Sequence, residues 1–512
     1  MISVVSVGGD DSLYIIKAND FIKDFSYPSF QGPLYPMILS IFVGIFGINL
    51  FVLKLLSAIF LTAHLYFLYK AFKERIPTSI LIVTIILLSI NSYFLFYGSQ
   101  TYAEAFFLMA QILFFVYFFK NFIADNEQIK TPKDTIIKYV SLGAIVLSLG
   151  LIKSVGFAAL FAILIYFAFV KNWKAIAYSA GGFFASFGLW QLIKLLIWSD
   201  KKAQFSDQAS TLFQKHPYDP SQGLETFGGF IQRFIDNSNI YLSRQLFKVF
   251  GLRPELIEID GALGAAPELP VLTILVYALL IVTFIWALRK NKFLLFTGIY
   301  VASIMGVSFI MLQTIWEGTR LIMVYFPLLA IYLVAGTYYL FKFKQLKPFQ
   351  FVFPIIAIIL IFSSFNTSQE KIKEHQKVFK YHLHGNITAG MTPDWVHFIN
   401  MCKWADNNVP KDKVIACRKP GIAFVYTGRR FEGIYKVTTQ DADSLVNYLY
   451  ERKIEYVVMA SLRKIEAQKT QFTINTIQRY LYFIQQKYPQ KIKLIHQIGN
   501  NDDEPAYLFK IE

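Results

Sequence analysis

Charged residues are scarce in this chain of 512 residues, because Lys, Arg, Asp and Glu together make up only 16% of it. A soluble globular domain has about a quarter of its residues charged. Hydrophobic residues reach 55%, so the composition excludes an ordinary water-soluble domain. It favours a protein that lies in a membrane.

Cysteine is nearly absent as well. Cys402 and Cys417 are the only two, and both lie in the polar C-terminal region. Their spacing fits no metal site. We interpret them as buried packing thiols, with a disulfide as the alternative in an oxidising compartment.

The sequence also lacks a glycine-rich phosphate loop, internal repeats and low-complexity linkers. The net charge of +16 does not indicate nucleic acid binding, because the Lys and Arg residues are spread over short loops between apolar runs. That distribution is typical of a multi-pass membrane protein, whose cytoplasmic loops are rich in Lys and Arg.

Apolar runs long enough to cross a bilayer, about 20 residues each, recur along the chain. They predict an α-helical polytopic membrane protein with about ten transmembrane helices. The predicted spans are 50–69, 78–97, 103–119, 139–152, 155–170, 175–198, 270–288, 293–313, 320–341 and 349–365.

Lys and Arg concentrate in every second loop between these spans. The loops after the odd-numbered spans hold clusters such as those in 70–75 and 289–292, whereas the alternate short connections hold only Lys153 and Arg320. The positive-inside rule therefore predicts that the first set is cytoplasmic. The N-terminal segment, the long loop 199–268 and everything after about 366 are then extracytoplasmic.

The N-terminal segment, residues 1–49, carries two adjacent carboxylates, Asp10 and Asp11. Residues 34–48 are apolar but short, and no turn separates them from the next span, so we interpret them as an interfacial helix in the membrane plane. Residues 1–7 resemble the end of an apolar segment, and we expect a first transmembrane helix to precede them. Charges beside hydrocarbon are expensive and tend to be functional, so the acidic pair is a candidate site.

The chain changes character after the transmembrane domain, 50–365. Residues 366–512 are polar, with helical patterns alternating with short apolar strands, which predicts a small extracytoplasmic α/β domain. The predicted helices are 393–408 and 441–453, and the predicted strands are 413–417, 421–428, 454–461, 491–499 and 507–512.

Other polar residues share the predicted outer side with the acidic pair. Glu104 begins a span, Lys153 lies in a tight turn, and Arg320 follows a glycine. A carboxylate in such a group can take a proton from a hydroxyl, and the cations can stabilise phosphate charge. Each residue also has a structural alternative: a solvated loop for the acidic pair, a helix cap for Glu104, an exposed turn for Lys153 and an interfacial anchor for Arg320. The same predicted side holds His216, Arg233, Arg244, Arg253 and Glu317.

The order of these features resembles the membrane-embedded C-type glycosyltransferases (GT-C). The similarity is to bacterial relatives of the dolichyl-phosphate-mannose–protein mannosyltransferases and to the lipid A aminoarabinose transferases. It covers the layout of residues 8–365 and includes Tyr14 after the acidic pair. Its motifs are GGDDSLY, QGPLYP, TYAEAFF and EGTRLIMVYFP.

The resemblance implies an inverting transfer of a sugar from a polyprenyl-phosphate donor to an acceptor hydroxyl outside the bacterial inner membrane. It implies that Asp10 is the catalytic base and that Asp11 takes a position where Glu is usual. Glu104 then matches the acidic residue of the second outer loop, and Arg320 a basic residue near the donor phosphate. Lys153 matches less well, because Arg is more usual there. The implied partners are the donor, a lipid, glycan or protein acceptor and membrane lipids, with no nucleic acid.

No cofactor is certain from the sequence. Some relatives use a divalent metal ion at the phosphate, for which Asp11, Glu104 and His216 are the candidate ligands. Three other functions stay open. They are a lipid-linked oligosaccharide ligase using the 199–268 loop, a flippase or transporter of lipid-linked sugars, and a non-catalytic membrane assembly subunit.

Overall fold

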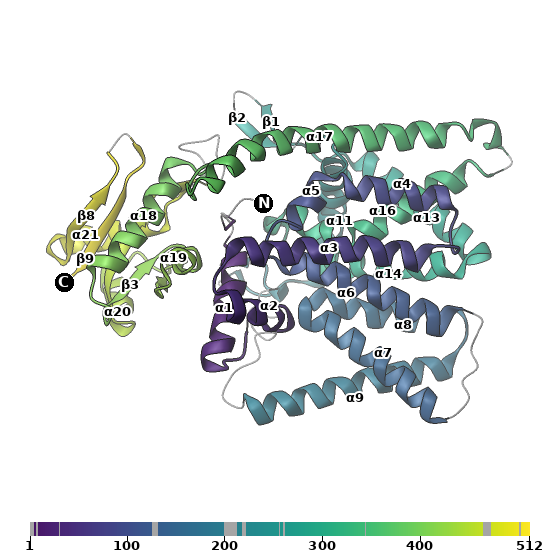
Figure 1. Cartoon of the computed structure of the whole chain (residues 1–512), viewed down its shortest axis with the longest axis horizontal. Coiled ribbons are helices and arrows are strands. Elements are labelled where there is room, and N and C mark those ends of the chain that lie inside the picture. The colour runs from purple at the N-terminus through teal and green to yellow at the C-terminus, as the bar shows by residue number, and fades with distance from the viewer. Residues whose placement is uncertain are drawn as a thin grey trace. The chain divides into compact units, whose positions relative to one another are not determined.

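Figure 1 shows a computed structural model of the chain. It describes residues 5–6, 9–29, 31–124, 132–198, 212–217, 222–254, 256–259, 262–343, 345–463, 473–500 and 503–512. Most of 199–221 in the predicted outer loop, and Lys130 in a predicted cytoplasmic loop, lie outside these residues.

The chain forms two compact units. Unit 1 comprises Met1–Asp20, Phe42–Val52 and His375–Glu512, and unit 2 comprises Phe21–Ile41 and Leu53–Glu374. The helix α17, Val352–Leu383, continues without interruption past residue 365, where the sequence suggested the start of a separate domain. The first residues of the chain and the C-terminal domain therefore belong to one unit.

Seven helices among the described residues are long and apolar enough to cross a membrane, since about 20 residues at 1.5 Å each span the hydrocarbon core. The protein is thus a multi-pass membrane protein. These helices are α3 (Leu50–Phe72), α6 with its π-helical end (Ala103–Ile123), α7 (Pro132–Ile152), α9 (Trp173–Ile197), α13 (Pro270–Lys290), α14 (Lys292–Met311) and α17 with a preceding turn (Lys347–Leu383).

The other three predicted spans are shorter helices. Residues 78–97 divide into α4 (Thr78–Ser89) and α5 (Ser92–Tyr97), because the Asn91 side chain caps the second helix. Residues 155–170 form a 3₁₀ turn and α8 (Ala158–Phe169), and 320–341 divide into α15 (Thr319–Met323) and α16 (Phe326–Leu340). The N-terminal helix α2 (Leu34–Phe46) has 13 residues, a length below that of a membrane span.

Small residues let two of the long helices of unit 2 pack closely. A Cβ atom on Gly143 of α7 would lie 2.2 Å from the carbonyl oxygen of Gly182 in α9. A Cβ on Gly182 would lie 2.3 Å from the carbonyl oxygen of Tyr139. Backbone contact of this kind is a common way for helices to associate in lipid, where water supplies no hydrophobic drive.

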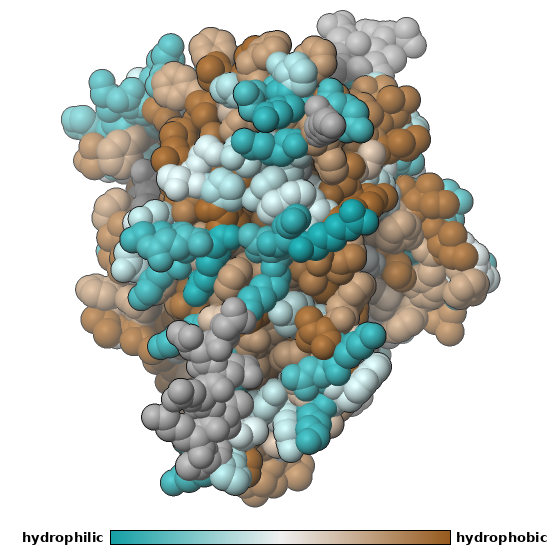
Figure 2. Space-filling view, turned by 90° about the vertical axis from the view of Figure 1, so that its right-hand side faces the viewer, coloured by the Kyte–Doolittle hydropathy of each residue, from teal (hydrophilic) through white to brown (hydrophobic). Residues whose placement is uncertain are grey.

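Polar residues gather at one end of unit 2. The α3–α4 and α16–α17 turns lie at the right-hand end of Figure 1, and Figure 2 faces that side, where hydrophilic residues form a band flanked by hydrophobic ones. The first turn holds Lys73 and Arg75, and the second holds Lys342 and Lys347. Two loops predicted to be cytoplasmic therefore share one end of the bundle.

The remainder of unit 2 is the segment before α13. It contains α11 (Phe227–Asn239), a π-helical stretch (Ile240–Gln245) and α12 (Leu246–Val249). A two-stranded antiparallel hairpin follows, with β1 (Leu256–Ile259) and β2 (Ala262–Ala265).

The C-terminal part of unit 1 is an α/β domain, as predicted. Its five-stranded sheet has the order β4-β3-β5-β9-β8, with β3 parallel to β4 and β5, and with β9 antiparallel to both of its neighbours. Its elements are α18 (Pro393–Asn408), β3 (Val414–Cys417), α19 (Pro420–Thr427), β4 (Glu432–Gly433), α20 (Ala442–Glu451), β5 (Ile454–Ala460), α21 (Thr476–Lys487), β8 (Ile492–Ile498) and β9 (Ala506–Ile511).

One predicted strand of this domain is wrong. Residues 421–428 were expected to be a strand for their β-branched and aromatic residues, but they lie in the helix α19. Pro420 occupies the first turn of this helix, and Gly428 ends it at φ 75° in the left-handed region. Proline at the start and glycine at the end are helix boundaries, and here they outweigh strand propensity. The helix α21 was not predicted.

Both cysteines are buried free thiols in this domain. Cys402 lies in α18 and Cys417 at the end of β3. Burial, together with the neighbouring Cys417, raises the pKa of the Cys402 thiol. The two thiols therefore pack in the domain core, as the sequence suggested.

Candidate functional site

The acidic pair opens helix α1, Asp10–Asp24, in unit 1. Carboxylates in the first turn of a helix are favoured, because the N-terminus carries partial positive charge. Gly9, which precedes the pair, has φ +85°, a conformation that favours glycine. The chain thus makes a sharp turn just before the two carboxylates.

The two carboxylates have different surroundings. Asp11 is fully buried, and its oxygens accept hydrogen bonds from the Ser6 backbone N–H (2.7 Å), the Ser6 hydroxyl (2.9 Å) and the Ser12 backbone N–H (2.9 Å). Asp10 is partly exposed. Asp11 therefore holds the turn before the helix, while Asp10 keeps contact with solvent.

A second polar cluster forms in unit 2 around Glu104, at the start of α6. Glu104 is fully buried, and its Oε1 accepts hydrogen bonds from Lys153 Nζ at 2.7 Å and from Arg320 Nε at 2.5 Å. Lys153 lies in the turn between α7 and α8, and Arg320 lies in α15. Three segments far apart in the sequence thus bring their polar residues to one point.

The charge of this cluster is positive, since two cations surround one carboxylate. The Arg320 guanidinium also lies over the Tyr102 ring, 4.4 Å from its centroid, a favourable cation–π geometry. The side chains of Lys153 and Arg320 are 12% and 21% exposed. A buried carboxylate that orients two partly accessible cations is suited to bind an anion such as a phosphate.

Of the five predicted site residues, the structure brings Glu104, Lys153 and Arg320 together in unit 2. Asp10 and Asp11 form a separate group in unit 1. The sequence-based prediction of a shared face for the two groups rests on loop charge alone.

The other residues of the predicted outer side have structural contacts. Arg233 is buried, pairs with Glu225 at 2.8 Å and donates to the carbonyl oxygens of Leu212 and Gln214. Arg253 donates to two further carbonyl oxygens of the same region. Arg244 pairs with Glu317 at 2.5 Å. Arg233 and Arg253 tie the segment before α13 together, and Arg244 joins it to the connection between α14 and α15.

No metal site is apparent among the described residues: they contain no cluster of three or more His, Cys, Asp or Glu side chains suited to a cation. Asp11 uses its oxygens to accept hydrogen bonds from Ser6 and Ser12. Glu104 uses Oε1 to bind Lys153 and Arg320, two cations that would repel a divalent ion. The surroundings of Asp11 and Glu104 therefore do not fit a metal, and the described residues form no such cluster around His216.

One polar residue of the membrane region was not singled out from the sequence. Lys54 in α3 is fully buried. It is the only charged residue in the predicted span 50–69, and an ionisable group inside a span is costly to retain. That isolation in an apolar run is the signal that could have identified it.

An apolar groove of about 150 Å³ runs between α4, α12, α13, α16 and α17 of unit 2. Leu246 and Phe247 contribute to its wall directly after Arg244 and Gln245, which both bind Glu317. The polar contacts of Glu317 and the apolar groove are thus formed by consecutive residues of one segment, 244–247. The remaining lining includes Val83, Val276, Leu333 and Phe353.

No family model and no curated protein matches this sequence, whereas solved structures do. The oligosaccharyltransferase of Archaeoglobus fulgidus, in complex with Zn and sulfate, matches at 13% identity and TM-score 0.55, over 88% of this chain and 64% of that one. ArnT from Cupriavidus metallidurans, bound to undecaprenyl phosphate, matches at 10% identity and TM-score 0.55, over 99% of this chain and 94% of that one.

A second structure of the archaeal enzyme, tethered to an acceptor peptide with the NVT sequon, matches at 13% identity and TM-score 0.54, over 97% of this chain and 69% of that one. At such identities the similarity defines the fold. The chain has the fold of the membrane-embedded C-type glycosyltransferases, as the sequence suggested.

Proposed function

We propose that this protein is a glycosyltransferase that moves a sugar from a polyprenyl-phosphate donor to an acceptor hydroxyl on the extracytoplasmic side of the membrane. The observation that carries the proposal is the Glu104 cluster, in which a buried carboxylate orients two cations within a membrane fold. The acidic pair at the start of α1 supplies the second requirement, a carboxylate base.

In the proposed reaction, Asp10 takes the proton of the acceptor hydroxyl as its oxygen attacks the anomeric carbon. The bond between that carbon and the phosphate oxygen breaks, and the polyprenyl phosphate leaves with the electron pair. A single displacement inverts the configuration, by the geometric logic of inverting glycosidases. Lys153 and Arg320 stabilise the negative charge that develops on the leaving phosphate.

The division of roles between the two aspartates follows from their surroundings. Asp11 accepts three hydrogen bonds from its own turn, which leaves few of its lone pairs for a substrate. Asp10 is partly exposed and is therefore better suited to exchange a proton with a substrate. Asp11 then positions its neighbour.

A lipid-linked donor also needs a path for its hydrocarbon chain. The apolar groove beside α12 suits a prenyl segment, because its lining offers almost no hydrogen-bond donors or acceptors. The similar ArnT is bound to undecaprenyl phosphate in its crystal structure, and that lipid is an amphiphile of this kind.

A second candidate function is transfer of an oligosaccharide from a diphosphate-linked lipid. The similarity to the oligosaccharyltransferase of A. fulgidus favours it. The arginines of the 199–268 loop give it less support, because Arg233 and Arg253 donate to backbone carbonyl groups. We therefore favour the monophosphate donor.

The test measures transfer by the full-length protein in proteoliposomes, using undecaprenyl phosphate that carries radiolabelled mannose or aminoarabinose. We expect transfer by the wild type and at least a hundredfold loss in Asp10→Ala. Binding of undecaprenyl phosphate alone, measured by native mass spectrometry, should weaken at least tenfold in Arg320→Ala. The exposed Lys174 provides the control, and Lys174→Ala should bind as the wild type does.

Three results would contradict the proposal. Full activity of the double variant Asp10→Ala/Asp11→Ala would remove the assigned base. Transfer only from a diphosphate-linked oligosaccharide would favour the ligase. Movement of the labelled lipid across the bilayer without sugar transfer would indicate a flippase.

A further inference from the structure

The α/β domain of unit 1 contacts helix α1 directly, through α19. The first turn of α19 lies against the first turn of α1: a Cβ atom on Gly421 would be 2.5 Å from Ser12 Oγ and 3.3 Å from Ser12 Cβ. Ile422 in the next position approaches Gly9, just before the acidic pair. Only a glycine at 421 permits this approach without a shift of Ser12.

Ser12 connects this contact to the carboxylates. Its backbone N–H donates to Asp11 Oδ1 at 2.9 Å, and its hydroxyl donates to the Gly9 carbonyl oxygen at 2.5 Å. The residue that α19 touches is thus the residue that completes the turn around Asp11. Tyr426, also in α19, lies close enough for the negative charge of Asp11 to add to burial in raising the pKa of its hydroxyl.

A second contact holds α1 eleven residues beyond Gly9. Arg430, three residues after Thr427 at the end of α19, forms an ion pair with Asp20. The Asp20 side chain is 10% exposed and that of Arg430 is 59% exposed. The guanidinium also lies 5.8 Å from the centroid of the Phe424 ring. Helix α1 is therefore held at its start by backbone packing and near its end by charge.

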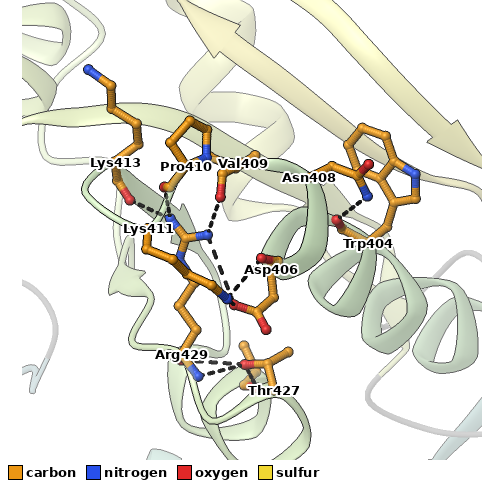
Figure 3. A network of polar contacts seen from close by, with 10 residues as sticks. Trp404, Asp406, Asn408, Val409, Pro410, Lys411, Lys413, Thr427 and Arg429 are labelled. Atoms are coloured by element: carbon orange, nitrogen blue, oxygen red, sulfur yellow. Dashed lines mark hydrogen bonds and ion pairs between the residues drawn. The ribbon is translucent and has the colours of Figure 1, made fainter.

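The adjacent Arg429 fixes α19 within its own domain. Figure 3 shows its guanidinium reaching the loop between α18 and β3, where it donates to the carbonyl oxygens of Val409 (2.8 Å), Pro410 (2.7 Å) and Lys413 (2.7 Å). The two neighbouring arginines thus bind different parts of unit 1. Arg429 anchors α19 to the α/β domain, and Arg430 joins that domain to α1.

From these contacts we infer that the C-terminal α/β domain is a positioning device for the acidic pair, with Gly421 and Arg430 as positioning residues. This inference rests on the proposed function, because it assigns the domain a task in presenting Asp10 to the acceptor. The domain holds α1 at its start and near its end, so the carboxylate is already ordered before the reaction. The entropy cost of ordering it in the transition state is therefore smaller.

The first experiment measures hydrogen exchange of the α1 peptide, residues 9–24, in the full-length protein, together with kcat and KM for transfer. Arg430→Ala should speed exchange of α1 by about fivefold, the effect of a partly exposed ion pair, and should lower kcat with little change in KM for the donor. Arg430→Lys should restore both. Arg452 pairs with Glu432 elsewhere in the domain, so Arg452→Ala is the matched control and should change neither.

The second experiment uses steric suppression. Gly421→Ala should speed exchange of α1 and lower kcat, because its Cβ collides with Ser12 Oγ. The double variant Ser12→Ala/Gly421→Ala removes that oxygen, leaves the nearest atom at 3.3 Å, and should recover most of the loss. Failure of recovery would show that Gly421 acts by another route.

The outcomes separate the two proposals. Unchanged exchange of α1 in both Arg430→Ala and Gly421→Ala overturns the positioning role, whatever the enzyme activity. Faster exchange in these variants, with a wild type that transfers no sugar from any tested donor, overturns the proposed function and leaves the mechanical link intact.

Discussion

Lys153 Nζ donates a hydrogen bond of 2.7 Å to Glu104 Oε1, although the two residues are 49 positions apart. The carboxylate is fully buried, and it accepts a second hydrogen bond from Arg320 at the same oxygen. The Glu104 carboxylate fixes the orientation of the two cationic side chains, which themselves stay partly accessible. The arrangement is therefore a structural cross-link whose geometry also suits the proposed phosphate site.

The first prediction concerns the charge of Glu104. Glu104→Gln leaves two cations close together with no carboxylate between them, and removing one member of a buried ion pair costs about 3 kcal/mol or more. We expect a lower melting temperature in detergent and at least a tenfold loss of transfer. Glu74→Gln, at an exposed position, should melt as the wild type does. An unchanged melting temperature for Glu104→Gln would show that the cluster does not stabilise unit 2.

The second prediction separates the two neighbouring aspartates by the same substitution. In the wild type, Ser6 and Ser12 donate hydrogen bonds to both oxygens of the Asp11 carboxylate. Asp11→Asn replaces one of these oxygens by an N–H₂ group, which cannot accept, and this should destabilise the start of α1 by about 1–3 kcal/mol. Asp10→Asn should change stability little and abolish most of the transfer. Hydrogen exchange of α1 and transfer rates, measured on both variants, test this division. Equal effects of the two variants on both measurements would contradict it.

The third prediction concerns the break between α4 and α5. Asn91 is fully buried, its Oδ1 accepts from the Phe94 N–H at 3.0 Å, and its Nδ2 donates to the Val249 carbonyl oxygen at 2.7 Å. Asn91→Ala loses both the helix cap and the link to the end of α12, so we expect a loss of about 2 kcal/mol. Asn91→Asp keeps the capping oxygen and should retain the cap while losing the link. Equilibrium unfolding in detergent gives the comparison.

The fourth prediction is a dependence on pH at Asp441. This carboxylate caps α20 by accepting from the Ser444 N–H at 2.9 Å and the Ser444 hydroxyl at 2.7 Å, and these hydrogen bonds lower its pKa. Because the folded pKa is depressed, the stabilisation is present above the unfolded pKa of about 3.9 and is lost as the pH falls through the folded value. Hydrogen exchange of the α20 peptide should differ between wild type and Asp441→Ala at pH 6. The difference should diminish below pH 4.

Much of the fold was predictable from the sequence, because membrane spans are recognised by their length and apolarity. The helix 393–408 and the strand 454–461 were also predicted nearly to their ends. The break at Asn91 was missed, because a single polar residue in an apolar run is compatible with a continuous helix until its capping partner is known. The helix α19 was missed for the opposite reason, since its interior has strand-forming residues and only Pro420 and Gly428 indicate a helix.

The candidate site was predictable in part. Glu104, Lys153 and Arg320 were selected because they share a predicted side, and the structure places both cations within hydrogen-bond distance of one Glu104 oxygen. The pairing itself could not be predicted, because loop charge gives sidedness and no distances. The contact between α19 and α1 had no sequence signal at all, since the residues involved are separated by about four hundred positions.

The close approach of Gly421 to Ser12 limits how relatives of this protein can diverge. A side chain at position 421 would occupy the volume of the Ser12 hydroxyl, so position 421 cannot gain a side chain unless residue 12 becomes smaller. Among distant relatives, a larger residue at 421 should therefore occur together with alanine or glycine at 12. Such correlated exchange between positions about four hundred residues apart can be detected by comparing related sequences.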